Sequence, residues 1–181
     1  MPANYLHGIE TTEIERGPRP IRVVKSAVIA LIGTAPTGPI NELTLCLNDT
    51  HATQFGPHTA GYSIPEALEG IYDFGAGTVL VVNVLDPAIH KTTVTGQLHQ
   101  FAGETPLQLK HSGLQHLQLM PLEGTDVYLE GTDYTVNRLT GQVTRLPAGS
   151  IPANAQIKAD YTYTDPNKVT AADIIGSVRC V

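Results

Sequence analysis

The sequence predicts an α+β protein in which a partial α/β core unit is followed by a small antiparallel β domain. Two continuous apolar runs, 26–33 and 78–85, have the length and β-branched content of strands covered on both faces. A helix-like apolar pattern lies between them, and from about residue 92 onward apolar residues recur at every second position. A chain of 181 residues forms one ordinary domain, or one domain with a smaller insertion.

Changes in composition divide the chain into four expected segments. The first 25 residues contain four bases and three acids, whereas the whole chain has a net charge of −6. Pro18 and Pro20 exclude a helix in this segment, which leaves an extended arm or a flexible terminus as open alternatives. The expected segments are 1–25 (extended N-terminal arm), 26–91 (α/β core portion), 92–166 (inserted antiparallel β domain) and 167–181 (short return segment and C-terminal tail).

The core portion is expected to contain two helices and a further short strand over 43–47. Asn48 has a side chain that caps helix N-termini, and it predicts a short helix after it. Ser63 and Glu66 have the spacing of a capping box and predict the start of a second helix, which ends before the glycine at 75. The apolar face of this second helix consists of Ile64, Ala67, Leu68, Ile71 and Tyr72.

The second half of the chain has the pattern of strands with one solvated face. Apolar and polar residues alternate over 157–164. The segments 134–136 and 143–146 flank Gly141, a residue that can adopt the positive φ of a hairpin turn. Thr170 is expected to cap a short helix that follows it.

The residues show no catalytic apparatus, so we expect a protein that is not an enzyme and uses no cofactor. The loop over 33–39 has the glycine spacing of a phosphate loop, but Pro39 and Ile40 stand where a lysine and a hydroxyl residue are required. The seven histidines lack the spacing of zinc ligands. Asp126, Glu130 and Asp133 lack the pattern of a calcium loop, and we interpret them as a solvated acidic rim.

Charge and hydropathy exclude further classes of protein. The net charge of −6 disfavours a general nucleic-acid coat, because such binding needs a basic face. No apolar run approaches the length of a membrane span, and the first residues lack the pattern of a signal peptide. The two cysteines fit no disulfide framework, which favours a reducing compartment.

Four stretches, taken in order, resemble a known family. They are Tyr5-Leu6-His7-Gly8-Ile9-Glu10 with Pro20-Ile21, the run 26–39, the strand 78–87, and Glu130-Gly131-Thr132-Asp133-Tyr134 with the later Asp173-Ile174-Ile175-Gly176. Together they resemble the N-terminal portion of contractile tail sheath proteins of P2-like phages and R-type bacteriocins, including an inserted β domain. Such proteins are usually much longer, so we expect the C-terminal core and second arm to be absent here, as in a fragment, a truncation or a short relative.

The resemblance implies a structural subunit that polymerises around an inner tube and drives its ejection by contraction. It implies as partners copies of the same chain, the inner tail tube protein, and a baseplate or tail terminator, without direct nucleic-acid binding or membrane insertion. The implied location is the virion tail, assembled in the bacterial host cytoplasm. Arms of neighbouring sheath subunits add strands to one another's sheets, so the expected residues of the assembly arm are Ile9, Ile14, Ile21, Val23 and Val24.

Two further expectations follow. An incomplete core would leave one of the two apolar runs, 26–32 or 78–85, with an open strand edge. The alternative function is a monomeric binding module, in which the β domain recognises a glycan or a surface protein through exposed tyrosines such as Tyr128 or Tyr134.

Overall fold

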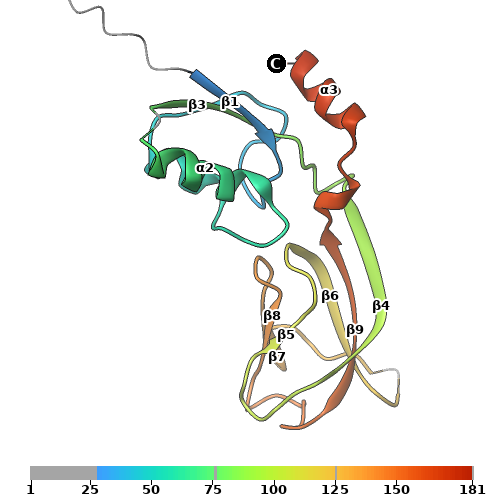
Figure 1. The fold of residues 1–181 in the computed structure, drawn as a ribbon. Helices are drawn as coiled ribbons and strands as arrows, with labels where there is room; N and C mark the ends of the chain where they lie inside the picture. Colours follow the sequence, from blue (N-terminus) through green and yellow to red (C-terminus); the bar gives the residue numbers. More distant parts are fainter. Residues whose placement is uncertain (1–27, 76, 125, 181) are drawn as a thin grey trace, which may run out of the picture.

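A computed structural model describes residues 28–75, 77–124 and 126–180. The chain forms two parts, drawn one above the other in Figure 1, and it combines helices with small sheets. The α+β fold class that the sequence predicts is therefore confirmed. The division into four segments stays a prediction, and the expected arm over 1–25 lies outside the described residues.

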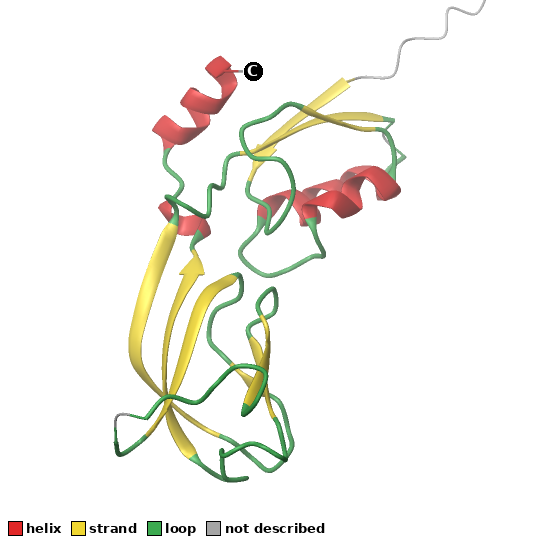
Figure 2. Cartoon of the chain, turned by 180° about the vertical axis from the view of Figure 1, so that it is seen from behind, coloured by secondary structure: helices red, strands yellow, loops and turns green. Residues whose placement is uncertain are grey.

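The first part, called the core sheet here, is a three-stranded sheet with helices beside it. The strand order is β1-β3-β2, with β1 parallel and β2 antiparallel to the central β3. Helix α2 lies across one face of the sheet (Figure 2). The elements in chain order are β1 (Val28–Gly33), β2 (Thr44–Cys46), α1 (Asp49–Ala52), η1 (Thr53–Phe55), α2 (Ser63–Asp73) and β3 (Thr78–Asn83).

Apolar side chains of α2 and of one sheet face form the core of this part. Ile64 and Leu68 of α2 are buried in one cluster with Val79 and Val81 of β3. Ile29 and Leu31 of β1 pack against the same cluster, as do Ile71 and Tyr72 of α2. The apolar helix face that the sequence predicts thus has its expected place.

The expectation that β1 is covered on both faces is wrong for the described residues. Exposure alternates along β1: Val28, Ala30 and Ile32 are exposed. The residues between them are half-buried. A continuous apolar run predicts two covering layers, but the described residues supply a helix layer on one face only. The open strand edge also belongs to β1 alone of the two apolar runs, since β3 is paired on both sides.

Helix α2 begins at Ser63, but not through the predicted capping box. Tyr62 occupies the N-cap position and makes no side-chain cap bond. The Ser63 hydroxyl oxygen instead accepts the Thr34 N–H at 3.0 Å, and the Thr34 carbonyl accepts the Ile64 N–H at 2.9 Å. A tertiary contact with the loop after β1 therefore replaces the local cap, and sequence spacing does not reveal such a contact.

The second part, called the β domain here, consists of two antiparallel three-stranded sheets. Their strand orders are β4-β9-β6 and β5-β8-β7. The predicted hairpin is confirmed, with Gly141 at φ 75° between β7 and β8. The strands are β4 (Lys91–Gln100), β5 (Leu107–Gln108), β6 (Leu114–Pro121), β7 (Tyr134–Asn137), β8 (Gln142–Arg145) and β9 (Gln156–Thr164).

Side chains from both sheets of the β domain form one buried cluster. Leu117 and Leu119 of β6 meet Ile157, Ala159 and Tyr161 of β9, and Val143 of β8 completes the contact between the sheets. The strand over 157–164 with one solvated face is therefore confirmed, because its alternate residues enter this cluster. The β domain encloses its own core.

Two expectations about the β domain are wrong. Tyr134 is 1% exposed, and Tyr128 packs against the buried cluster, so neither is an exposed binding tyrosine. Asp133 is buried rather than part of a solvated rim. Its carboxylate accepts the N–H groups of Leu129 and Ser150 at 2.7 and 2.8 Å and the Ser150 hydroxyl at 2.7 Å. These bonds connect the loop before β7 to the loop after β8.

The chain leaves the β domain through η2 (Pro166–Lys168) and continues into α3 (Ala171–Cys180). Thr170 stands directly before α3, at the predicted position, and its N–H and its hydroxyl both donate to the Asp173 carboxylate at 2.7 Å. His90 Nε2 lies 3.4 Å from the same carboxylate, and the Ser177 hydroxyl bonds to the Asn41 side-chain oxygen. Among the described residues, no helix has both the length and the apolar character needed to cross a membrane.

Candidate assembly surface

The free edge of β1 is the first element of the candidate surface. β1 pairs with β3 in unbroken register from Val28 to Gly33, and no described strand pairs with its other edge. The Val84 N–H donates to the Gly33 carbonyl at 2.9 Å, so Gly33 directs its main chain toward β3. Because main-chain groups alternate between the two edges of a strand, Ala30 and Ile32 direct their N–H and C=O groups to the free edge.

The uncovered side of the same sheet is apolar. Ile29 and Leu31 face α2, so the residues between them face away from it. Ala30, Leu80 and Leu45 form one row across the three strands. We call the set Val28, Ala30, Ile32, Leu45 and Leu80 the open sheet face; within it, Val28 is 60%, Leu45 50% and Ile32 39% exposed. Exposed apolar residues in contiguous rows are typical of protein contact surfaces.

The end of β1 is fixed in place by the start of α2. A Cβ atom at Gly33 would lie 2.5 Å from the Ser63 hydroxyl oxygen, so only glycine allows this approach. The bonds between Thr34 and the first turn of α2 hold the two elements together. The free edge and the open sheet face are therefore presented by a fixed strand and not by a loop.

Asn83, at the end of β3, fastens the loop that follows β1. Its side chain is buried, and its Oδ1 atom accepts the N–H groups of Ala35 and Leu85, each at 3.1 Å. The loop over 33–39, which the sequence predicts to be a connector, thus has a main-chain donor bound to a protein amide. Sequence reasoning missed Asn83, although a lone amide inside an apolar run is a usable signal of a structural role.

The residues predicted for the assembly arm were Ile9, Ile14, Ile21, Val23 and Val24. All five lie outside the described residues, so their role in assembly stays a prediction. The described chain begins with β1 at Val28, directly after this segment.

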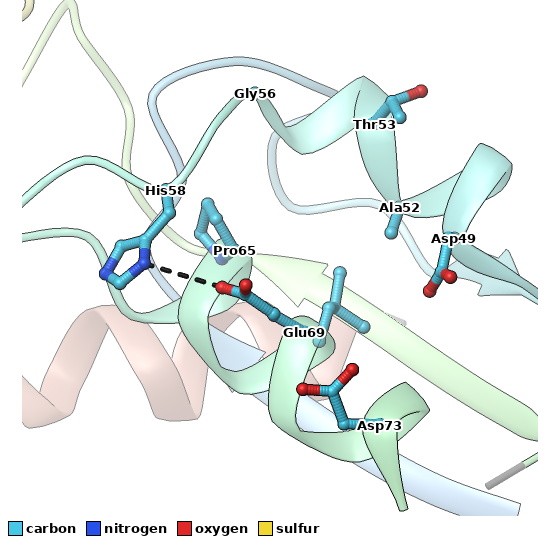
Figure 3. A pocket seen from close by; sticks show the side chains of 9 residues that line it. Asp49, Ala52, Thr53, Gly56, His58, Pro65, Glu69 and Asp73 are labelled. Carbon is cyan, nitrogen blue, oxygen red and sulfur yellow. Dashed lines mark ion pairs between the residues drawn. The ribbon is translucent and has the colours of Figure 1, made fainter. Parts of the chain in front are cut away.

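A groove between α1 and α2, beside the core sheet, has a volume of about 410 Å³ (Figure 3). Asp49, Glu69 and Asp73 line it, and His58 Nδ1 lies 3.5 Å from Glu69 Oε2. The groove has no nucleophile beside a base, which acyl or phosphoryl transfer requires. Within the part of the chain that the structure describes, no group of acidic, histidine or cysteine side chains is placed to hold a metal ion.

A smaller hollow of about 180 Å³ lies where the two parts meet. The His111 and Tyr163 rings stack beside it at 4.0 Å. Burial raises the pKa of Asp165, but hydrogen bonds from Thr92 and Asn167 outweigh burial and hold that pKa below its usual value. Because the Asp165 carboxylate is already bonded to protein groups, we interpret this hollow as a structural joint. Sequence reasoning missed Asp165 in this role.

Comparison with known proteins identifies a relative of the chain. No protein family model matches it. The chain is 53% identical over 181 residues to the tail sheath protein of Burkholderia phage BcepMu, which covers 99% of this chain. The chain spans 38% of the length of that relative. The predicted resemblance to a phage tail sheath protein is thereby confirmed.

Proposed function

We propose that this chain is a structural part of a contractile phage tail sheath and joins copies of itself through the free edge of β1. The sheath surrounds an inner tail tube protein, meets a baseplate or tail terminator at its ends, and drives the tube outward by contraction. It is located in the virion tail, is assembled in the host cytoplasm, and has no enzymatic activity. The 53% identity to a tail sheath protein supports the sheath role.

The unpaired edge of β1 is the observation that supports strand addition as the contact between copies of the chain. An added strand gains main-chain hydrogen bonds with little demand on side-chain identity. The expected donor is the segment over 1–25 of a neighbour, where Ile21, Val23 and Val24 have the β-branched content of a strand. Pro18 and Pro20 pre-extend this segment and lower its ordering cost.

Charge supports the same contact between unlike surfaces. The segment over 1–25 has four basic and three acidic side chains, whereas the remainder of the chain has seven basic and fourteen acidic ones. A ring or helical lattice is built from heterologous contacts, in which two different surfaces meet. One chain of this composition supplies both surfaces.

The two tyrosines on which the alternative of a monomeric binding module depends are not exposed. That function was assigned to Tyr128 and Tyr134, and both side chains contribute to the core of the β domain instead. No specific feature of the described residues favours it over sheath assembly.

Proline at Ala30 tests the proposal directly. Ala30→Pro removes an N–H from the free edge without removing a bond to β3, whereas the matched control Ala30→Val keeps that N–H. By sedimentation velocity and negative-stain microscopy of the full chain, we expect the control to assemble and the proline variant to remain small while keeping its circular dichroism spectrum. Equal assembly of the two folded variants would remove the β1 edge from the account.

The donor segment is tested separately. Deletion of residues 1–20 should abolish polymerisation and leave the fold intact, and Val23→Pro should weaken assembly by removing one donor from the added strand. Normal polymers from the deletion variant would show that the segment over 1–20 takes no part.

A further inference from the structure

Strand β4 has a second long edge that is unpaired in the described structure. It runs over ten residues and pairs with β9 on one side only. A free strand edge of this length is a template for another chain. If β4 also accepted an added strand, as β1 is proposed to do, copies of the chain would join at two different places. The specificity of assembly therefore depends on what prevents strand addition at β4.

A β-bulge interrupts β4 at its centre. Val94 pairs with Tyr161 and Gln97 pairs with Ala159, so Thr95 and Gly96 together stand opposite the single residue Asp160. Gly96 has φ 66°, in the left-handed region that favours glycine. Its N–H donates to the Asp160 carboxylate at 2.6 Å. A charged acceptor therefore fixes the extra residue in place.

The bulge changes what the free edge of β4 presents. Residues on either side of it keep their inward side chains, since Val94 and Gln97 both stand opposite buried residues of β9. The regular alternation of outward N–H and C=O groups is broken at Gly96, and a bulge also bends and twists the strand. An incoming straight strand can therefore pair with one half of β4 but not with its full length.

The outer edges of β2 and β6, on the far sides of the same two sheets, have other protections. β2 is only three residues long. The edge of β6 is partly covered, because the Tyr128 N–H donates to the Leu119 carbonyl at 2.9 Å. β1 has none of these features: its six residues pair without a register shift and include neither charge nor proline.

We propose that Gly96 and Asp160 are specificity determinants of assembly, which block strand addition at β4 and so direct added strands to β1. This inference rests on the proposed function. The bulge supplies the block by geometry, and the Asp160 carboxylate holds the bulge against straightening.

A reporter cysteine at Thr95 tests the inference in the full chain. Thr95 is exposed, and the background carries Cys180→Ser. Deleting Gly96 places Thr95 alone opposite Asp160 and keeps every inward residue inward, which yields a regular free edge. On mild oxidation, we expect Thr95→Cys chains to form disulfide-linked dimers at least about tenfold faster with the deletion than without it.

A second variant decides the outcome if the deletion prevents folding. Asp160→Ala releases the Gly96 N–H but keeps the residue count, and Glu104→Ala removes a matched exposed acid away from the bulge. Cross-linking should increase with Asp160→Ala and stay at the parental rate with Glu104→Ala. A parental rate in Asp160→Ala, or in a folded deletion variant, would overturn the inference.

The test also separates this inference from the proposed function. A reporter at Ala30→Cys follows contacts at β1, on the other part of the molecule. If the Ala30 reporter shows no contact in assemblies, the proposed function fails. If the Ala30 reporter does show contacts, but cross-linking of the Thr95 reporter is the same with and without the bulge, only the role of Gly96 and Asp160 fails.

Discussion

The core sheet and the β domain each contain a three-stranded sheet, but they differ in how completely they cover themselves. The β domain packs a second sheet over the first and buries Tyr134, Leu119 and Tyr161 between them. The core sheet packs α2 on one face and leaves the open sheet face in solvent. The β domain thus encloses its own core, while the core sheet presents an unpaired strand edge and an exposed apolar surface.

The largest expected effect comes from the self-contained part. Leu119→Ala removes a fully buried side chain of the β domain, and we expect a loss of about 2–5 kcal/mol in the free energy of unfolding. The matched substitution Leu45→Ala, on the open sheet face, should change that free energy by less than about 0.5 kcal/mol. Urea denaturation of the unassembled chain measures both. Equal losses would mean that the two faces are equally covered.

An intermediate effect is expected at Asn83. Asn83→Ala leaves the Ala35 and Leu85 N–H groups without their acceptor, and we expect a loss of about 1–3 kcal/mol in the free energy of unfolding. Asn154, which is exposed in a turn, provides the control Asn154→Ala with little change. A neutral Asn83→Ala variant would show that this amide does not hold the loop after β1.

A smaller, pH-dependent effect is expected at Asp133. Hydrogen bonds from the N–H groups of Ser150 and Leu129, and from the Ser150 hydroxyl, lower the pKa of Asp133 below its usual value. The stabilisation is therefore fully present above the unfolded-state pKa of about 3.9 and is lost as pH falls through the folded-state pKa.

Asp133→Asn should remove this part of the pH dependence. Thermal unfolding followed from neutral to acidic pH would show a shallower decline in stability for Asp133→Asn than for the parent chain. The exposed Asp126 gives a control, Asp126→Asn, that should keep the parental slope. A parental slope in Asp133→Asn would contradict the assigned role of the buried carboxylate.

The sequence predicts elements well where a local pattern decides the structure. The apolar face of α2, the hairpin at Gly141 and the alternating strand β9 follow from periodicity and turn chemistry, and the structure agrees with all three. Thr170 likewise lies at the start of α3, with the Asp173 carboxylate three residues later.

Predictions from the sequence failed where a tertiary partner decides the structure. Ser63 fits a capping box, but its hydroxyl oxygen accepts the Thr34 N–H instead of an N–H of its own helix. Asp133 and Tyr134 fit an exposed loop and an exposed strand, but the loop at Ser150 and the second sheet enclose them. An apolar run such as that of β1 predicts a buried strand. It does not indicate whether residues of the same chain or of another chain cover the faces of that strand.

The candidate surface was therefore only partly predictable. The open edge was expected for one of two runs, and pairing assigns it to β1 because β3 lies at the sheet centre. The bulge at Gly96 was not predicted, since its signal is a single glycine within a strand. The role of the segment over 1–25 stays a prediction.

Hydrogen exchange of the main chain tests the central claim most directly. Peptides covering β1 (Val28–Gly33) and β4 (Lys91–Gln100) would be compared between assembled and dissociated full-length chains. We predict that assembly slows exchange in the β1 peptide by at least about tenfold, as expected for newly bonded N–H groups, and leaves the β4 peptide unchanged. Unchanged exchange in β1, or equal slowing in both peptides, would contradict the account.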